Sequence, residues 1–219
     1  MEGIIYKVQA YQEHGRLLFT YTPKGKITLL AQGAQKLNQT SRILSQFLTR
    51  IEFKEGSNSK SFIKLQEGVI IDDYHLIKDD FIKTKAAAMM TEIIDHVVVD
   101  NQEHTFIYRE LIEALSAKDS ILSSLSFALK ILKALGYEIN LEPDGRTVKG
   151  VSIANGSLVY EGETIGCDLD VKAATSLLRL MHLPYQALNN DVITHIEVIK
   201  IFILKYYNYH LQTTLKNLQ

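Results

Sequence analysis

The N-terminal fold is decided by the stretch GIIYKVQAYQEHGRLLFTYTPKGKITLLAQG, residues 3–33. Its β-branched and aromatic residues fall into three short runs, residues 3–12, 16–22 and 25–33, and such runs are typical of strands. The turn between the second and third runs contains Pro23-Lys24-Gly25, in which proline fixes φ and glycine adopts a positive φ without strain. This stretch therefore predicts three short strands joined by tight turns.

Two further runs of the same kind follow at residues 44–53 and 61–71, with a turn signal at residues 56–58. Five short antiparallel strands that close on themselves, with side chains alternating between two faces, form a small barrel of the oligonucleotide-binding type, or OB-fold. We therefore expect residues 1–78 to form an OB-fold domain that binds nucleic acid.

The pattern changes after Asp72-Asp73, where alanines, methionines and helical apolar spacing replace the strand-like runs. Helices are predicted at residues 79–99, 105–118, 120–136, 170–182 and 191–215. A hairpin at about residues 142–166 interrupts them, and its signal is Asn155-Gly156, a pair that favours a tight hairpin turn. The sequence thus predicts an α+β protein, in which a five-stranded OB-fold barrel is followed by a helical domain (residues 79–219) with an inserted β-hairpin.

The composition limits the class of protein. Lys and Arg number 24, Asp and Glu number 25, and the apolar fraction of 46% suffices for a packed core. No run of 18 apolar residues occurs, and the first ten residues lack the pattern of a signal peptide. The single cysteine, Cys167, excludes an internal disulfide. These features predict a cytoplasmic protein with no membrane partner.

Basic residues are concentrated in the predicted barrel. Residues 14–51 contain six Lys or Arg and no Asp or Glu, and from residue 16 to residue 64 nine basic residues stand against two acidic ones. Because the whole chain is close to neutral, this asymmetry predicts that the N-terminal part binds a polyanion. Lys and Arg bind the phosphates of DNA by releasing condensed counterions, and a carboxylate in the same groove would repel the DNA.

Aromatic residues are interleaved with these cations. Aromatic side chains stack on bases of any sequence, and Phe19 and Tyr21 lie two apart, on one face of their predicted strand. The other interpretation of the aromatics is the barrel core, with Phe19 as the core member if both point inward, and the other interpretation of the cations is a solvated face. The predicted DNA-binding residues are Arg16, Phe19, Tyr21, Lys24, Lys26, Lys36 and Arg42.

No catalytic site is indicated by the sequence. The seven histidines are scattered, and there is no His-x-Glu-x-x-His, Gly-x-Ser-x-Gly or Walker-type glycine motif. Helix capping accounts for the pair Asp79-Asp80, and the acidic neighbour Asp168 disfavours a thiolate at Cys167. We therefore predict a protein that is not an enzyme and that holds no metal or cofactor.

Four segments, in this order, resemble the bacterial recombination mediator RecO family. They are the opening stretch at residues 3–36, AAAMMTEIIDHVV at 86–98, KALGY at 133–137 and YYNYHLQTTLK at 206–216. The resemblance implies a protein that binds single-stranded and double-stranded DNA, anneals strands coated with single-strand-binding protein, and helps a RecR partner to load RecA. RecF and RecA would be indirect partners, and the protein would associate with the nucleoid during repair.

The predicted hairpin departs from the family pattern. Many members hold a structural zinc ion with two Cys-x-x-Cys pairs, and the corresponding positions here are Asp144, Thr147, Tyr160 and Glu163, which cannot form a thiolate site. We therefore predict a degenerate zinc-finger-like region without zinc, in which packing and turn chemistry alone keep the shape of the hairpin.

A second departure concerns a protein partner. Some relatives carry Arg-Phe-Glu before the KALGY-like segment, with the arginine implicated in binding an acidic tail, whereas this chain has Ser126-Phe127-Ala128. The C-terminal tail of single-strand-binding protein, acidic with an apolar end, requires an apolar groove beside a cation. The predicted groove residues are Phe127, Lys130, Ile131 and Lys133. Phe127 and Ile131, four apart on one helix face, also fit ordinary core positions.

A second function fits the same residues. A general RNA- or oligonucleotide-binding module with a helical interaction domain would share the barrel and its basic face but would not stimulate annealing. A strand-annealing assay with and without single-strand-binding protein distinguishes the two functions. No feature of the sequence supports a hydrolase.

Overall fold

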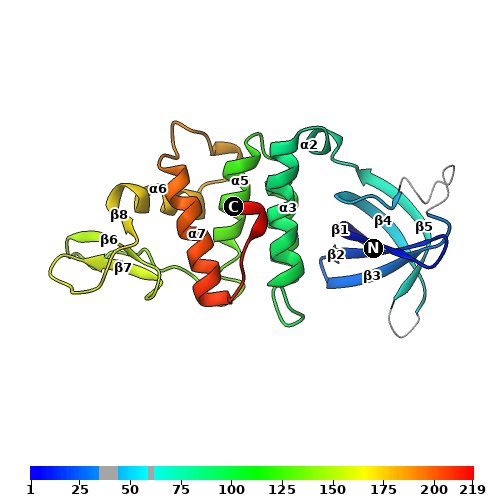
Figure 1. Cartoon of the computed structure of the whole chain (residues 1–219), viewed down its shortest axis with the longest axis horizontal. Coiled ribbons are helices and arrows are strands. Elements are labelled where there is room, and N and C mark those ends of the chain that lie inside the picture. Colours follow the sequence, from blue (N-terminus) through cyan, green and yellow to red (C-terminus); the bar gives the residue numbers. More distant parts are fainter. Residues whose placement is uncertain (35–43, 59–61) are drawn as a thin grey trace. The chain divides into compact units, whose positions relative to one another are not determined.

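The computed structural model of the chain, shown in Figure 1, describes residues 1–34, 44–58 and 62–219. Its contacts define two compact units. One contains Met1–Phe81 and Val99–Arg109, and the other contains Ile82–Val98 and Glu110–Gln219. We call them the barrel unit and the helical unit. The domain boundary between residues 78 and 79 stays a prediction.

The barrel unit is a closed five-stranded barrel, as the sequence predicts. The strand order is β1-β2-β3-β5-β4, and β1 pairs with β2 and with β4 in antiparallel fashion. One pairing differs from the prediction, because β3 and β5 run parallel. The strands are β1 (Glu2–Tyr11), β2 (Gly15–Thr22), β3 (Gly25–Ala31), β4 (Thr49–Asn58) and β5 (Ile63–Asp72).

The fourth strand begins five residues later than predicted, at Thr49 instead of Leu44. Leu48 has a φ of 54°, in the left-handed region, so an extended strand cannot pass through it. The Leu48 side chain is nevertheless fully buried, and its N–H donates to the carbonyl of Ile5 at 2.8 Å. The apolar residues of this segment are buried against the barrel without forming a strand. Their pattern alone predicts a strand, and this explains the difference.

The interior of the barrel is filled by alternate side chains of its strands. Ile5, Leu18, Leu29 and Ile51 are fully buried there, and Phe53 is 2% exposed. These residues face inward because successive side chains of a strand point to opposite faces. The intervening residues of β1, β2 and β3 consequently form an outer face.

The helical unit contains fewer helical residues than the sequence predicts. The third predicted helix, residues 120–136, ends as α5 at Lys130, and the segment to Gly136 continues as turns. The last helix begins at Ile196, since His195 adopts a φ of 60°. The described helices of the whole chain are α2 (His75–Lys78), which lies in the barrel unit, α3 (Phe81–His96), α4 (His104–Leu115), whose first half lies in the barrel unit, α5 (Ser120–Lys130), α6 (Val171–His182) and α7 (Ile196–Leu211), with short 3₁₀ turns η1 (Tyr185–Ala187) and η2 (Lys216–Leu218).

The inserted hairpin is present where the sequence predicts it. Strands β6 (Val148–Ser152) and β7 (Ser157–Tyr160) flank the turn, and the short strand β8 (Leu169–Asp170) pairs with the other edge of β6. Gly156 has a φ of 59°, which glycine adopts without strain and which the Asn-Gly turn requires.

The first prediction tests the barrel core. Ile51→Ala removes a fully buried side chain from the barrel interior and should lower the free energy of unfolding by about 2–5 kcal/mol. Val69→Ala, at a β5 position that is 67% exposed, should change it by less than about 0.5 kcal/mol. Urea denaturation followed by circular dichroism measures both, and equal losses would contradict this assignment of the core.

Candidate nucleic-acid interface

Phe19 and Tyr21 lie on the outer face of the barrel, as their spacing predicts. In the β2–β3 register Phe19 lies opposite Thr28 and Tyr21 opposite Lys26. Residues directly opposite in an antiparallel pair point to the same face. Lys26 therefore shares the outer face with both aromatics, while Leu18 points into the core.

Tyr21 cannot serve as a stacking platform, which corrects the prediction for this residue. The first half of α4 covers it, so that the ring is fully buried and packs edge-on against His104 at 5.8 Å between ring centroids. The Tyr21 hydroxyl and His104 Nδ1 are 3.1 Å apart. Burial raises the pKa of the Tyr21 hydroxyl above its ordinary value. Of the two aromatics, Tyr21 and not Phe19 is the buried one.

Phe19 remains partly accessible and has a cation beside it. Lys7 Nζ lies 5.2 Å from the centroid of the Phe19 ring, and the Tyr6 ring packs against the Phe19 ring at a centroid distance of 6.4 Å. Lys7 was not among the predicted DNA-binding residues because it precedes the acid-free stretch. The signal that could have found it is the hairpin register, which places Lys7 directly opposite Phe19.

Lys24 is exposed on the turn between β2 and β3, and its backbone is fixed. Thr22 Oγ1 accepts from the Lys24 N–H at 3.1 Å and donates to the Gly25 carbonyl at 2.9 Å. Pro23 of the same turn lines a pocket of about 530 Å³ in the barrel unit. The other residues that line this pocket are Gln102, Glu103, His104, Thr105, Phe106 and Arg109.

The pocket adds an aromatic ring and a cation to the interface. The Arg109 guanidinium lies 5.5 Å from the centroid of the Phe106 ring. Both residues lie far from the basic stretch in the sequence, and only the position of α4 brings them beside the β2–β3 turn. No signal in the sequence marks them as part of an interface.

The remaining predicted residues are distributed unevenly. Arg16 is partly exposed and donates from Nη1 to the Ser45 carbonyl at 3.2 Å. Its position three residues before Phe19 places it on the opposite face of β2 from that ring. Lys26 is partly exposed on the outer face. Lys36 and Arg42 lie outside the described residues.

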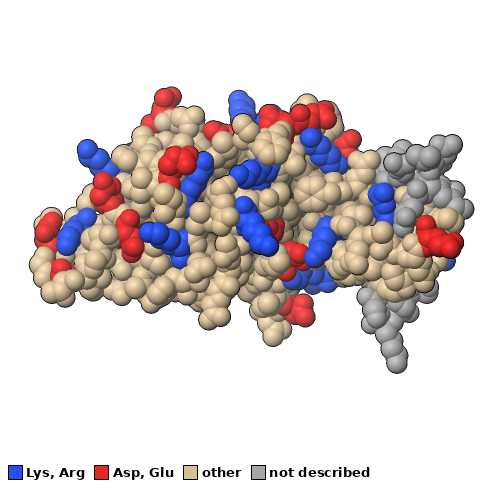
Figure 2. All heavy atoms as spheres, in the orientation of Figure 1, with Lys and Arg blue, Asp and Glu red and all other residues tan. Residues whose placement is uncertain are grey.

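Ion pairs neutralise part of the basic stretch. Arg50 Nη2 lies 2.8 Å from Glu2 Oε2, and Lys54 Nζ lies 2.7 Å from Glu67 Oε2. Figure 2 shows one face of the molecule, on which Lys and Arg side chains are interspersed with Asp and Glu over the helices. The candidate interface is therefore a small set of side chains, namely Lys7, Phe19, Lys24, Lys26, Phe106 and Arg109.

The predicted partner groove in the helical unit is not assembled from the expected residues. Phe127 and Ile131 are fully buried and belong to the core, so neither can line a surface groove. Lys130 Nζ donates to the Leu183 carbonyl at 2.8 Å and lies 3.9 Å from the centroid of the Tyr185 ring. Burial lowers the pKa of Lys130. Full burial thus corrects the assignments of Phe127 and Ile131, while the assignment of the partly exposed Lys130 stays a prediction.

Lys133 is the one predicted groove residue on the surface. It is exposed and lines a pocket of about 360 Å³ with the apolar side chains of Leu178 and Met181 and with His182. Glu138 Oε1 lies 3.5 Å from Lys133 Nζ. Leu178, Met181 and His182 of α6 line one part of this pocket and Lys133 follows the end of α5, while Glu138 and Glu142 also line it.

Arg146 contacts three of the four residues that the resemblance aligns with zinc-ligand positions, namely Asp144, Tyr160 and Glu163. Arg146 Nη2 lies 2.7 Å from Asp144 Oδ2, Arg146 Nη1 lies 2.7 Å from Glu163 Oε1, and the guanidinium lies 3.9 Å from the centroid of the Tyr160 ring. The hydrogen bond from Arg146 lowers the pKa of the Asp144 carboxyl, and the Tyr160 N–H together with Arg146 lowers the pKa of Glu163. In the described part of the chain no group of three or more His, Cys, Asp or Glu side chains could hold a metal ion.

The chain matches known proteins over both of its units. The family model for the C-terminal part of recombination protein O matches residues 78–219. A DNA repair protein RecO from Clostridium perfringens is 32% identical over 146 residues, 64% of this chain and 59% of that protein. The RecO protein of Clostridium acetobutylicum is 27% identical over 233 residues, 94% of this chain and 91% of that protein. A Listeria monocytogenes RecO is 28% identical over 141 residues, 62% of this chain and 54% of that protein.

A closed OB-type barrel followed along the chain by a helical unit defines the class of protein. Within that class the chain belongs to the RecO family of recombination mediators, since the family model covers well over half of it. Membership supports a role in DNA repair and recombination. No helix in the described ranges has the length and apolar character to cross a membrane.

The second prediction concerns the hairpin. Arg146→Ala should accelerate amide hydrogen exchange in residues 142–166, because it removes the link between Asp144 and Glu163.

The purified protein should contain no stoichiometric zinc, and a chelator should leave its melting temperature unchanged. The carboxyl pKa values of Asp144 and Glu163 are lowered in the folded state, so the contribution of their ion pairs with Arg146 is present above the ordinary values of 3.8 and 4.5 and is lost as pH falls below them.

Elemental analysis and exchange measured by mass spectrometry test these statements. Lys149→Ala, an exposed position of β6, is the control and should leave exchange unchanged. One zinc per chain, or exchange in Arg146→Ala that equals that of the parent protein, would overturn them.

Proposed function

We propose that this protein is a non-enzymatic DNA-binding recombination mediator, which binds single-stranded and double-stranded DNA and anneals complementary strands. The observation that carries the proposal is the family match over residues 78–219, joined to a barrel whose outer face presents Lys7, Phe19 and Lys26 together. Cations neutralise phosphates and an accessible ring stacks on bases of any sequence.

Annealing sets a specific physical requirement. Two polyanionic strands must be neutralised at once, while their bases remain free to pair. The outer face suits this requirement because Phe19 is only partly accessible and Tyr21 is covered by α4, which limits stacking on this part of the barrel. Binding on such a face depends chiefly on the cations, so the strand is held by its backbone and its bases can leave the protein for a complementary strand.

The helical unit is proposed to bind protein partners. The pocket at Lys133, Leu178 and Met181 fits the acidic, apolar-ended tail of single-strand-binding protein. In this proposal the protein works with RecR to load RecA, and RecF acts indirectly. Its place of action is the cytoplasm, at the nucleoid during repair.

A general RNA- or oligonucleotide-binding module is the second candidate function, favoured by the barrel and its cations alone. An annealing assay with and without single-strand-binding protein separates the two. Acceleration of annealing of coated strands supports the mediator, whereas binding without any acceleration supports the general module.

The third prediction concerns salt. Affinity for single-stranded DNA should fall linearly with salt concentration on logarithmic axes, with a slope of about 0.7 for each phosphate contacted, and should depend little on sequence. Fluorescence anisotropy with labelled oligonucleotides between 50 and 200 mM salt, roughly the range over which counterion release is strong, measures the slope. An affinity that is constant over this range would contradict the proposal.

The fourth prediction locates the interface. Replacing Lys24 and Lys26 together by Ala should weaken DNA binding and lower the salt slope by about 0.7 for each phosphate that the variant no longer neutralises. The matched control replaces Lys118 and Lys172, two lysines of the helical unit, and removes the same charge. Equal loss in both double variants would mean that net charge, and not the outer face, controls binding.

The fifth prediction separates the protein partner from DNA. Lys133→Glu should weaken binding of a fluorescent peptide with the acidic tail of single-strand-binding protein, because the new carboxylate faces an acidic ligand, and should leave annealing of bare strands unchanged. Lys172→Glu, on the same helix α6 as Leu178 but outside the pocket, is the control. If Lys133→Glu binds the peptide as the parent protein does, the pocket is not its site.

A further inference from the structure

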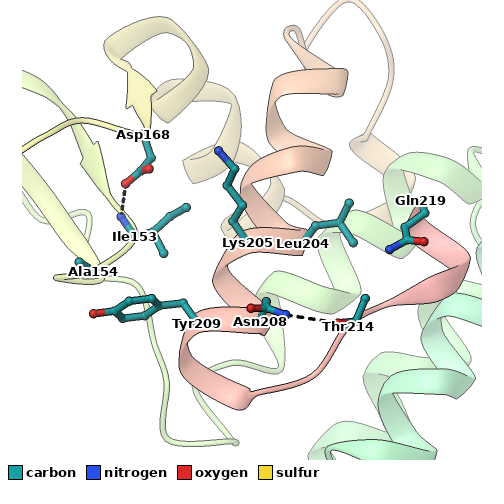
Figure 3. Close-up of a pocket in the computed structure, with 9 residues that line it drawn as sticks. All are labelled: Ile153, Ala154, Asp168, Leu204, Lys205, Asn208, Tyr209, Thr214 and Gln219. Atoms are coloured by element: carbon teal, nitrogen blue, oxygen red, sulfur yellow. Dashed lines mark hydrogen bonds between the residues drawn. The ribbon is translucent and has the colours of Figure 1, made fainter.

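A separate pocket of about 510 Å³ lies between the inserted hairpin and α7, within the helical unit. Figure 3 shows side chains of α7 on one side and those of the hairpin segment on the other. Ile153 and Leu204 give it apolar walls, and Lys205, Asn208, Tyr209 and Asp168 place polar groups around them. Pockets that bind small ligands have this volume and this combination of apolar walls with a few polar groups.

Tyr209 differs from the other tyrosines of α7. Its neighbours Tyr206 and Tyr207 are buried, and their hydroxyls donate to the carbonyls of Tyr137 and Ala128. Tyr209 is 61% exposed at the edge of the pocket and contacts His210 edge-on at a centroid distance of 4.9 Å. Because more than half of its surface is exposed, the Tyr209 ring is accessible for stacking.

The polar groups of the pocket are complementary to a nucleotide. Lys205 has no hydrogen-bond or ion-pair partner in the described ranges, so its ammonium is available to an anion. Asp168 Oδ2 accepts from the Ile153 N–H at 2.7 Å, which leaves Oδ1 as a free acceptor. Asn208 Nδ2 donates to Thr214 Oγ1 at 3.2 Å, which leaves its own Oδ1 as a second acceptor.

We propose that this pocket binds one nucleotide of single-stranded DNA, with the base stacked on Tyr209 and the phosphate on Lys205. The free oxygen of Asp168 would accept a hydrogen bond from an exocyclic amino group, which cytosine and adenine carry and thymine lacks. The inference rests on the proposed function in one respect, that the protein binds single strands. It adds a second contact, in the helical unit, with a preference for bases that carry an amino group.

An acidic peptide fits this pocket less well than a nucleotide. A peptide carboxylate attracted to Lys205 would leave the exposed Tyr209 ring and the Asp168 carboxylate of the same pocket without a complementary group. A nucleotide separates its anionic phosphate from its amino group, so the phosphate can lie at Lys205 while the amino group lies at Asp168. The pocket at Lys133 remains the proposed peptide site.

A second contact would matter for annealing. A protein that holds one strand on the barrel and another at α7 keeps both near each other, and linked sites raise the effective concentration of the second strand. A single nucleotide contact of this kind is weak enough to be released when the strands pair.

The test compares variants of the full chain. Tyr209→Ala should weaken binding of a labelled oligo-dC by about fivefold or more, as expected when one base stack is removed. Tyr209→Phe keeps the ring, and Ile201→Ala, an exposed apolar position of α7 outside the pocket that is 53% exposed, is the matched control. Both variants keep the aromatic ring at position 209. Both should therefore bind oligo-dC within about twofold of the parent protein, which is less than the loss expected for one base stack. Asp168→Asn replaces the free acceptor by an amide donor, so it should remove the preference of the parent protein for oligo-dC over oligo-dT.

The outcomes separate this inference from the proposed function. If Tyr209→Ala is folded and binds oligo-dC as the parent does, while the Lys24 and Lys26 variant is impaired, the nucleotide pocket is wrong and the barrel interface stands. If the parent binds neither oligonucleotide, the proposed function fails. Perturbation of Tyr209 signals in NMR by dCMP alone would support the pocket and assign it to free nucleotides as well as strands. Binding of an acidic peptide that requires Tyr209, with oligo-dC binding unchanged, would overturn it.

Discussion

The hydrogen bond between Tyr21 and His104 fixes the outer face of the barrel. His104 Nε2 lies 3.0 Å from the Asp100 carbonyl, which can only accept, so Nε2 carries the proton and Nδ1 accepts from the Tyr21 hydroxyl. A buried hydroxyl without this partner would be costly, and a buried imidazole has the same requirement. The pair therefore holds the first half of α4 against β2 and divides the outer face into a covered part at Tyr21 and an open part at Phe19.

The difference in exposure between Tyr21 and Phe19 determines which side chains of the barrel could contact DNA. Of the two predicted rings only Phe19 is partly open, with Lys7 beside it, while Lys26 lies opposite Tyr21 and Lys24 lies on the β2–β3 turn. The same helix brings Phe106 and Arg109 to the β2–β3 turn. A single helix thus both removes one stacking residue and supplies another aromatic and cation.

In the helical unit, side-chain interactions of Arg146 hold the segments that flank the glycine-rich hairpin. Arg146 joins Asp144 to Glu163 and lies over Tyr160, so one side chain links the segment before β6 to the segment after β7. These ion pairs are exposed and each contributes little by itself. The hairpin is also packed from within, since Val151 and Val159 are fully buried. The Arg146 contacts therefore fix the flanking segments while the packing stabilises the strands.

The sequence by itself determined the local structure: the five strands with their tight turns, the α+β order, the Asn155-Gly156 hairpin and the family resemblance, because these depend on residues close together in the chain. It placed β4 and α7 wrongly at their starts, since the left-handed residues Leu48 and His195 carry no sequence signal. It also could not assign Tyr21 or Phe127, whose burial depends on α4 and on core packing. Only the tertiary structure decided which side chains stay accessible, because exposure depends on the elements that pack over a residue and not on its neighbours in sequence.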